Sequence, residues 1–127
     1  RNLSLVLNAD KQLVPSKIES FYRKDVKRGL AGLFGELGEE VFKLRHFADA
    51  FKYWKRGEEI DNTNAVVLNG LLRLEKEAEE LLKAGKSLAS AGKLVDARAK
   101  LTLARDIVKP GRSTHKEAAA ALKKLGQ

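Results

Sequence analysis

The sequence offers few side chains that could do chemistry. Its only histidines are His46 and His115, and it contains no cysteine, which excludes thiol nucleophiles, disulfides and thiolate metal sites. His46 is expected in a turn and His115 near the start of a helix, so both are interpreted as structural or solvent-facing. The densest acidic run, residues 75–80, alternates with apolar residues on a solvated helix side. We therefore expect no enzyme activity, no catalytic residue, no metal site and no cofactor.

The length and composition describe one folded domain. With 127 residues, 43% of them hydrophobic and 33% charged, the chain is long enough to bury about two thirds of the surface that its unfolded form exposes. No apolar stretch approaches the ~20 residues needed to cross a bilayer. The chain begins at Arg1 and contains no methionine, which favours a fragment of a longer protein. We expect a soluble domain, and the compartment, cytoplasmic or periplasmic, stays open.

Apolar periodicity after Pro15 predicts helices only. Residues 1–14 fit either a strand or a helix, whereas residues from Ser16 onward repeat apolar positions every three to four residues. One long helix, or two joined near Gly29, would account for the stretch to about residue 44. Further helices are predicted over 46–60, 65–91, 94–108 and 114–125. Residues 114–117 have the form of a capping box for the last of these helices.

The predicted helix over residues 65–91 carries a heptad-like seam. Its apolar or small residues step alternately by four and three, from Val67 to Leu88. The polar residues 61–64 should form the turn before it, and Gly92 should end it as a left-handed cap. Such a seam also suits pairing with a second copy, so a homo-oligomer is one interpretation of this helix.

The sequence contains an internal repeat. A shift of 47 residues superposes Gly38 on Gly85, Ala50 on Ala97, and Trp54 on Leu101. Small residues at fixed positions allow two antiparallel helices to cross closely, while the large residue fills the gap to the next helix. We therefore expect two copies of one helical hairpin.

The first copy resembles a tetratricopeptide repeat over residues 31–64. It has the family's order of Leu37-Gly38, Val41-Phe42-Lys43, Ala50, Trp54 and Gly57 before a polar turn. A second copy covers 78–111, and the 13 extra residues 65–77 continue the seam, so they should lengthen a helix. The resemblance implies an all-α domain of antiparallel hairpins with one elongated helix and flanking capping helices. Its parts would be an N-terminal helix (16–30), repeat 1 (31–64), an extended repeat 2 (65–111) and a C-terminal capping helix (113–127).

The resemblance also implies a function, since tetratricopeptide domains are scaffolds that bind a partner segment in a groove lined by the first helix of each pair. The asparagine and lysine set with which some members hold a C-terminal carboxylate is not reproduced. Carried over position by position, the partner-binding residues are Gly32, Gly35, Glu39, Phe42, Lys43, Glu79, Leu82, Lys86, Ala89 and Ser90.

The charge is concentrated in the C-terminal part of the chain. Residues 1–82 carry 14 basic and 14 acidic side chains, whereas residues 83–127 carry 11 basic and 3 acidic ones. This asymmetry favours an acidic protein or peptide partner, and binding to nucleic acid or an anionic membrane surface is the alternative function. All eight aromatic residues lie between 21 and 54, which disfavours base stacking at the basic end. The basic patch would consist of Lys83, Lys86, Lys93, Arg98, Lys100, Arg105, Lys109 and Arg112.

Overall fold

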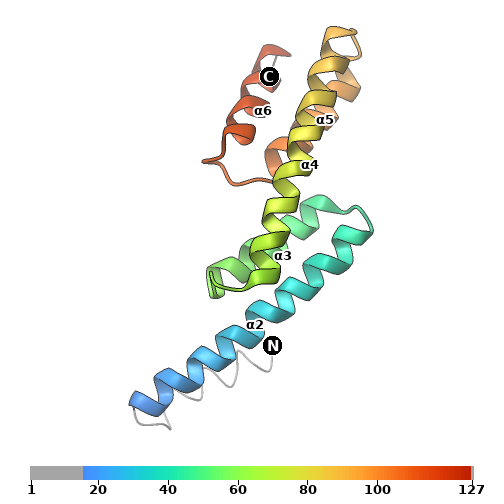
Figure 1. Ribbon diagram of the computed structural model, residues 1–127. Helices are drawn as coiled ribbons and strands as arrows, with labels where there is room; N and C mark the ends of the chain where they lie inside the picture. Colours follow the sequence, from blue (N-terminus) through green and yellow to red (C-terminus); the bar gives the residue numbers. More distant parts are fainter. Residues whose placement is uncertain (1–15, 127) are drawn as a thin grey trace.

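The computed structural model describes residues 16–126, which form five helices joined by short turns (Figure 1). The helices are α2 (Ser16–Lys43), α3 (Phe47–Ile60), α4 (Ala65–Ser90), α5 (Leu94–Asp106) and α6 (Ser113–Lys124). Residues 16–126 contain no strand, which confirms the all-α prediction. The segment 1–14, for which both a strand and a helix were open, lies outside the described residues. Among the described helices, none combines the length and the apolar character that crossing a bilayer requires.

The helix α2 runs without a break for 28 residues, so the alternative of two helices joined near Gly29 is wrong. Val26, Leu30 and Ala31, on both sides of that glycine, are buried. A Cβ atom placed on Gly57 of α3 would lie 3.5 Å from the Ala31 carbonyl, so the two helices cross closely there. Burial of this stripe outweighs the intrinsic cost of a glycine inside a helix, which is ~0.5–1 kcal/mol relative to alanine.

The chain folds into two antiparallel hairpins, α2 with α3 and α4 with α5 (Figure 1). Both hairpins turn through the same backbone path. Arg45 has a φ of 64°, and Gly92, which lies 47 residues further on, has a φ of 80°. The amide of His46 donates to the carbonyl of Val41 at 2.9 Å, and the bond 47 residues later has the same length. The left-handed cap predicted at Gly92 is confirmed.

In both hairpins, a large side chain packs directly against a glycine of a neighbouring helix. A Cβ atom at Gly38 of α2 would lie 2.2 Å from the indole of Trp54, and one at Gly70 of α4 would lie 2.4 Å from the same ring. In the second hairpin, a Cβ atom at Gly85 would lie 2.7 Å from Leu101. Positions 38 and 85, and positions 54 and 101, are those that the 47-residue shift superposes. The same type of contact therefore occurs in each hairpin.

The long helix α4 joins the two hairpins, as Figure 1 shows. Its first half packs against the first hairpin, and its second half packs against α5 and α6. Most of the heptad-like seam is buried within the chain, including Val67, Leu71, Leu74 and Ala78. The prediction of an elongated helix is confirmed. The chain's own helices cover most of the seam, so this stripe is not free to pair with a second copy.

Local hydrogen bonds explain where α4 begins. The side chain of Asn64 accepts a hydrogen bond from the amide of Val67 at 3.0 Å, which satisfies a free donor of the first turn. In the preceding turn, the carboxylate of Asp61 accepts bonds from the amide and the hydroxyl of Thr63. These two bonds lower the pKa of Asp61 below its ordinary value of 3.8, the hydroxyl bond contributing most.

The start of α6 differs from the sequence-based prediction. The helix begins at Ser113, its N-cap is Arg112, and no side chain caps it. Thr114 is buried at 7% exposure, and the carboxylate of Glu117 pairs with Lys86 of α4. The capping box predicted over residues 114–117 is therefore wrong, because tertiary contacts take up both of the side chains that would form it.

Candidate functional site

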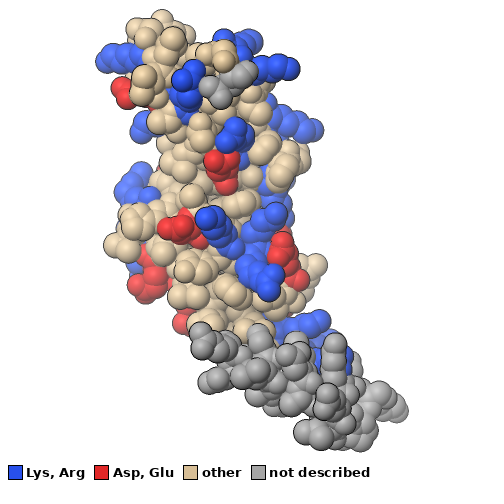
Figure 2. Space-filling model, turned by 180° about the vertical axis from the view of Figure 1, so that it is seen from behind, with Lys and Arg blue, Asp and Glu red and all other residues tan. Residues whose placement is uncertain are grey.

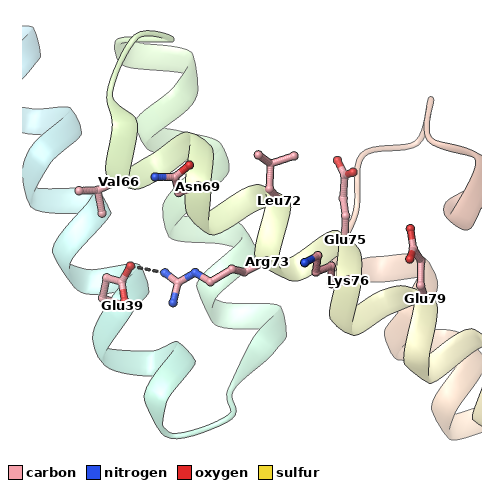
Figure 3. Close-up of a pocket in the computed structure, with 8 residues that line it drawn as sticks. All are labelled: Glu39, Val66, Asn69, Leu72, Arg73, Glu75, Lys76 and Glu79. Atoms are coloured by element: carbon pink, nitrogen blue, oxygen red, sulfur yellow. Dashed lines mark hydrogen bonds and ion pairs between the residues drawn. The ribbon is translucent and has the colours of Figure 1, made fainter.

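A groove follows the face of the molecule formed by α2, α4 and α6, and we call it the α2–α4–α6 groove. Three pockets make it up, with volumes of about 780, 440 and 380 Å³. The largest lies beside the first half of α4 and reaches α2, whereas the two smaller ones lie between the second half of α4 and α6. The largest pocket is lined by Glu39, Val66, Asn69, Leu72, Arg73, Glu75, Lys76 and Glu79 (Figure 3).

Two large aliphatic side chains give the largest pocket its apolar surface. Val66 is 45% exposed and Leu72 is 55% exposed, although each belongs to a residue type that is usually buried. Figure 3 shows both side chains projecting from α4, with charged or polar neighbours on either side. An apolar surface inside a pocket with a polar rim is typical of a binding site.

Arg73 forms the wall of the largest pocket towards α2. Its guanidinium makes an ion pair with Glu39, which Figure 3 marks as a dashed line. The guanidinium carbon also lies 4.6 Å from the centre of the Phe42 ring and 5.2 Å from the centre of the Trp54 ring system. These cation–π contacts fix the guanidinium against both helices of the first hairpin. The charged wall is therefore held in place before any partner binds.

An ion pair between α4 and α6 borders both of the smaller pockets. The ammonium group of Lys86 lies 3.3 Å from the carboxylate of Glu117. One pocket is lined by Lys86, Ala89, Ser90, Leu101, Glu117, Ala120, Ala121, Lys124 and Leu125. The other is lined by Glu79, Leu82, Lys83, Lys86, Ser113, Thr114 and Glu117. The three pockets adjoin one another, because Glu79 lines both the largest pocket and the second of these, and Lys86 and Glu117 line both smaller pockets.

Some of the predicted partner-binding residues line the groove and others do not. Those that line the groove are Glu39, Glu79, Leu82, Lys86, Ala89 and Ser90. Leu82 is only 7% exposed, so it is chiefly a core residue and adds little accessible surface. Phe42 and Lys43 line none of the three pockets. The ring of Phe42 packs in the core at 5.2 and 5.5 Å from the rings of Phe47 and Trp54, and Lys43 is exposed.

The remaining predicted positions are glycines. A Cβ atom at Gly32 would meet no atom within 4 Å, so this residue borders open space. A Cβ atom at Gly35 would lie 3.2 Å from the side chain of Val66, which places this glycine at the contact between α2 and α4. Gly35 therefore serves the packing of the two helices.

In the largest pocket, sequence analysis missed six residues, all in the segment 65–77 that the repeat alignment treats as an insertion. They are Val66, Asn69, Leu72, Arg73, Glu75 and Lys76. The signal was present, because four of them recur at spacings of three and four on one side of a predicted helix. It could not be interpreted without knowing that α2 lies beside this helix.

The predicted basic patch does not form one surface. Arg98 donates a hydrogen bond to the carbonyl of Leu125 at 3.2 Å, and Arg112 lies 2.7 Å from Glu75. Arg105 bonds to its neighbour Asp106, which raises the pKa of the guanidinium above its ordinary value. The three arginines of the patch therefore serve contacts within the chain.

The lysines of the patch are distributed over different elements. Lys109 pairs with Glu58 at 2.6 Å, whereas Lys83, Lys93 and Lys100 are exposed. Lys83 lines the groove, Lys93 stands in the turn before α5, and Lys100 lies on α5. Basic side chains nevertheless predominate over the upper part of the face seen in Figure 2.

Neither histidine belongs to the groove. His46 is the N-cap of α3, and its side chain makes no capping bond. The Nδ1 atom of His115 lies 2.8 Å from the carbonyl oxygen of Arg105, which joins α6 to α5. Within residues 16–126, no group of three or more histidine, aspartate or glutamate side chains is placed to hold a metal ion.

Comparison with protein-family models, with curated proteins and with solved structures found no match for this chain.

Proposed function

We propose that this domain is a protein-interaction scaffold that binds a segment of a partner protein in the α2–α4–α6 groove. The observation that carries the proposal is the pair of exposed aliphatic side chains, Val66 and Leu72, in a pocket of about 780 Å³ with charged residues around it. The resemblance to tetratricopeptide repeats gives independent support, since most of the positions that it implies for a binding groove line these pockets.

The dimensions of the groove suit a peptide segment. From Val66 to Glu79, α4 advances about 20 Å at ~1.5 Å per residue. An extended chain covers this length with about six residues at ~3.3 Å each. The two smaller pockets add space for several more. A partner segment of roughly ten residues would therefore contact the whole groove.

Polyanion binding remains the alternative, with weaker support. It requires basic side chains that converge on one surface and are available to phosphates. Arg98, Arg105 and Arg112 are instead engaged within the chain. The exposed Lys83, Lys93 and Lys100 lie on α4, in the turn before α5 and on α5. Binding of an oligonucleotide that disappears between about 50 and about 300 mM salt would favour this alternative.

The test is a selection from a random peptide library displayed on phage, followed by titration of the enriched peptides. The variants Val66→Lys and Leu72→Lys place a charge in the apolar part of the groove. Because both side chains are already exposed, these variants should fold normally, which circular dichroism would verify. We expect them to bind the enriched peptides at least about tenfold more weakly, as burying an unpaired ammonium group is costly.

Two control variants have the same chemistry elsewhere. Val95 on α5 is 80% exposed, and Leu44, in the turn after α2, is 65% exposed; neither lines the groove. Val95→Lys and Leu44→Lys should leave peptide binding unchanged. Enriched peptides that bind all four variants equally, or a library that yields no enriched peptide, would count against the proposed function.

A further inference from the structure

We infer that the pocket of about 440 Å³ between α4 and α6 receives an aromatic side chain of the partner segment, with a carboxylate beside the ring. Ala89, Ala120 and Ala121 line this pocket, and we call it the alanine pocket. The inference rests on the proposed function, because it specifies the ligand of one part of the same groove. It follows from a comparison of the two hairpins, since at the first hairpin the chain fills the equivalent space with its own side chains.

The 47-residue relation between the hairpins extends to the helix that covers each of them. It superposes the first half of α4 on α6. Val67 and Leu71 of α4 are buried, and so are Thr114 and Ala118, which lie 47 positions later on α6. The helix α6 therefore packs on the second hairpin with the face that the start of α4 packs on the first.

At the first hairpin, three large side chains from α2, α3 and α4 pack against one another. The ring of Phe42 lies 5.5 Å from the ring of Trp54, and the guanidinium carbon of Arg73 lies 4.6 Å from the centre of the Phe42 ring. Arg73 also pairs with Glu39. The chain itself therefore supplies two stacked rings and a paired charge at this place.

At the second hairpin, smaller side chains stand at the same positions. The 47-residue shift places Ala89, Leu101 and Ala120 where the first hairpin has phenylalanine, tryptophan and arginine. All three line the alanine pocket, and Leu101 is buried at its base. The pocket is therefore the space that an aromatic ring occupies at the first hairpin. A ring from a partner would pack there against the apolar walls that α4, α5 and α6 provide.

The charges at the alanine pocket are opposite to those at the first hairpin. Lys86 and Lys124 line the pocket, at positions where the first hairpin has glutamates. Those glutamates pair with Arg73 and Arg45. The second hairpin has alanine and glycine where the two arginines would stand, so it lacks the side chains that would provide the corresponding counter-charges.

The chain supplies one carboxylate for the two lysines. The ammonium group of Lys86 lies 3.3 Å from the carboxylate of Glu117. Lys124 is exposed and has no ion-pair partner within residues 16–126. A carboxylate of the partner would therefore pair with Lys124. Because an exposed pair is weak, the ring should provide most of the affinity and the carboxylate a smaller preference.

A small probe tests the pocket without a partner protein. 3-Phenylpropanoate carries one ring and one carboxylate. In an NMR titration, the methyl signals of Ala89, Ala120 and Ala121 should shift to saturation with a Kd in the millimolar range, as about eleven heavy atoms can provide. Hexanoate, which lacks the ring, and 2-phenylethylammonium, which reverses the charge, should bind at least about threefold more weakly. Equal binding of the three probes, or no saturable shift of these methyl groups, would overturn the inference.

Filling the pocket should prevent binding of the probe. Ala89→Phe places a ring at the position that corresponds to Phe42, and Ala120→Phe places one at an exposed residue of the opposite wall. Each should weaken 3-phenylpropanoate binding at least about tenfold. The matched control is Ala99→Phe, at an exposed residue of α5 outside the groove, and circular dichroism verifies that all three variants fold. Blocking variants that bind the probe as tightly as the control would contradict the inference.

Reversing the charge at position 124 tests the carboxylate. Lys124→Glu gives this position the sign that the first hairpin has there. It should weaken 3-phenylpropanoate binding about threefold and strengthen 2-phenylethylammonium binding by a similar factor. Lys100→Glu changes the net charge equally at an exposed residue of α5, outside the groove, and should leave both probes unaffected. Equal effects of the two variants would mean that only the overall charge matters, which would refute the assigned carboxylate.

Peptides selected through the groove separate this inference from the proposed function. From Leu72 to Ala89, α4 advances about 25 Å at ~1.5 Å per residue, which an extended segment covers with about eight residues. Peptides that lose affinity for Leu72→Lys should therefore carry an aromatic residue, with an acidic neighbour, about eight positions from their apolar anchor. Ala89→Phe should weaken these peptides at least about tenfold. Groove-dependent peptides that are insensitive to Ala89→Phe and Ala120→Phe would refute this inference and leave the proposed function intact. Peptides that depend on neither pocket would refute both.

Discussion

The contact between Gly38 and Trp54 gives the most direct test of the packing. A methyl group at position 38 would lie 2.2 to 2.5 Å from three indole atoms, whereas ordinary contacts begin at 3.4 Å. The ring would have to move by about 1 Å, but α4 also packs closely against it, since a Cβ atom at Gly70 would lie 2.4 Å from the same ring. Trp54 also donates a hydrogen bond from Nε1 to the carbonyl of Gly35 at 3.0 Å. Gly38→Ala should therefore strain the core.

The expected magnitude combines opposing terms. Overpacking a filled core costs about 1–3 kcal/mol, and weakening the buried indole hydrogen bond costs about 1 kcal/mol. Replacing glycine by alanine within a helix returns about 0.5–1 kcal/mol. The net effect of Gly38→Ala should be a loss of about 2 kcal/mol in the free energy of unfolding. For a domain of this size, that lowers Tm by about 8 °C.

The same helix supplies the control. A Cβ atom at Gly32 would meet no atom within 4 Å, so Gly32→Ala gains helix propensity without a clash. It should raise the free energy of unfolding by up to about 1 kcal/mol. Urea denaturation followed by the fluorescence of Trp54, the only tryptophan in the chain, measures both variants and reports on the environment of the ring. A Gly38→Ala variant that is as stable as Gly32→Ala, with unchanged emission, would refute this account of the packing.

Three further predictions concern turns and charged contacts. Arg45 has a left-handed backbone with a φ of 64°, so Arg45→Gly should raise stability by about 1 kcal/mol in thermal denaturation, whereas Gly92→Ala should lower it by a similar amount. Hydrogen bonds from Thr63 lower the pKa of Asp61. The contribution of Asp61 to stability is therefore present above pH 3.8 and is lost as the pH falls towards the lower pKa of the folded state. A carboxyl titration by NMR that shows an ordinary pKa for Asp61 would contradict this prediction. Arg73→Ala should cost about 1 kcal/mol in urea denaturation, because it removes an ion pair and two cation–π contacts, and Arg73→Met, which keeps the apolar stem, should cost less.

Local signals were sufficient to predict most of the helices. The side chain of Asn64 caps α4, and Gly92 turns the chain after it, and both effects depend on residues that are close in the sequence. The seam of α4 was predictable because any helix with that spacing has an apolar stripe to bury. The sequence does not show which surface covers this stripe, so pairing with a second copy was an alternative. In the structure, the chain's own two hairpins bury most of the stripe.

Contacts between distant residues could not be predicted in the same way. The ion pair between Glu39 and Arg73 joins residues that are 34 positions apart, and no pattern in the sequence links them. Thr114 illustrates the opposite error, since it has the right type and spacing for a helix cap but is buried against neighbouring helices. A local rule gave the wrong boundary there because tertiary packing contributes more free energy than a single cap.

The segment 65–77 shows why the site was harder to predict than the fold. Its buried residues, such as Val67 and Leu74, follow the seam, and this alone would make it a structural extension. Much of the surface of Val66 and Leu72 is not used by the fold, since Leu72 is 55% exposed and Val66, although it contacts Gly35, is 45% exposed. Single exposed aliphatic residues are common on proteins, so neither one alone indicates a function. They become informative because they share a pocket, one wall of which is an arginine already fixed by its own contacts.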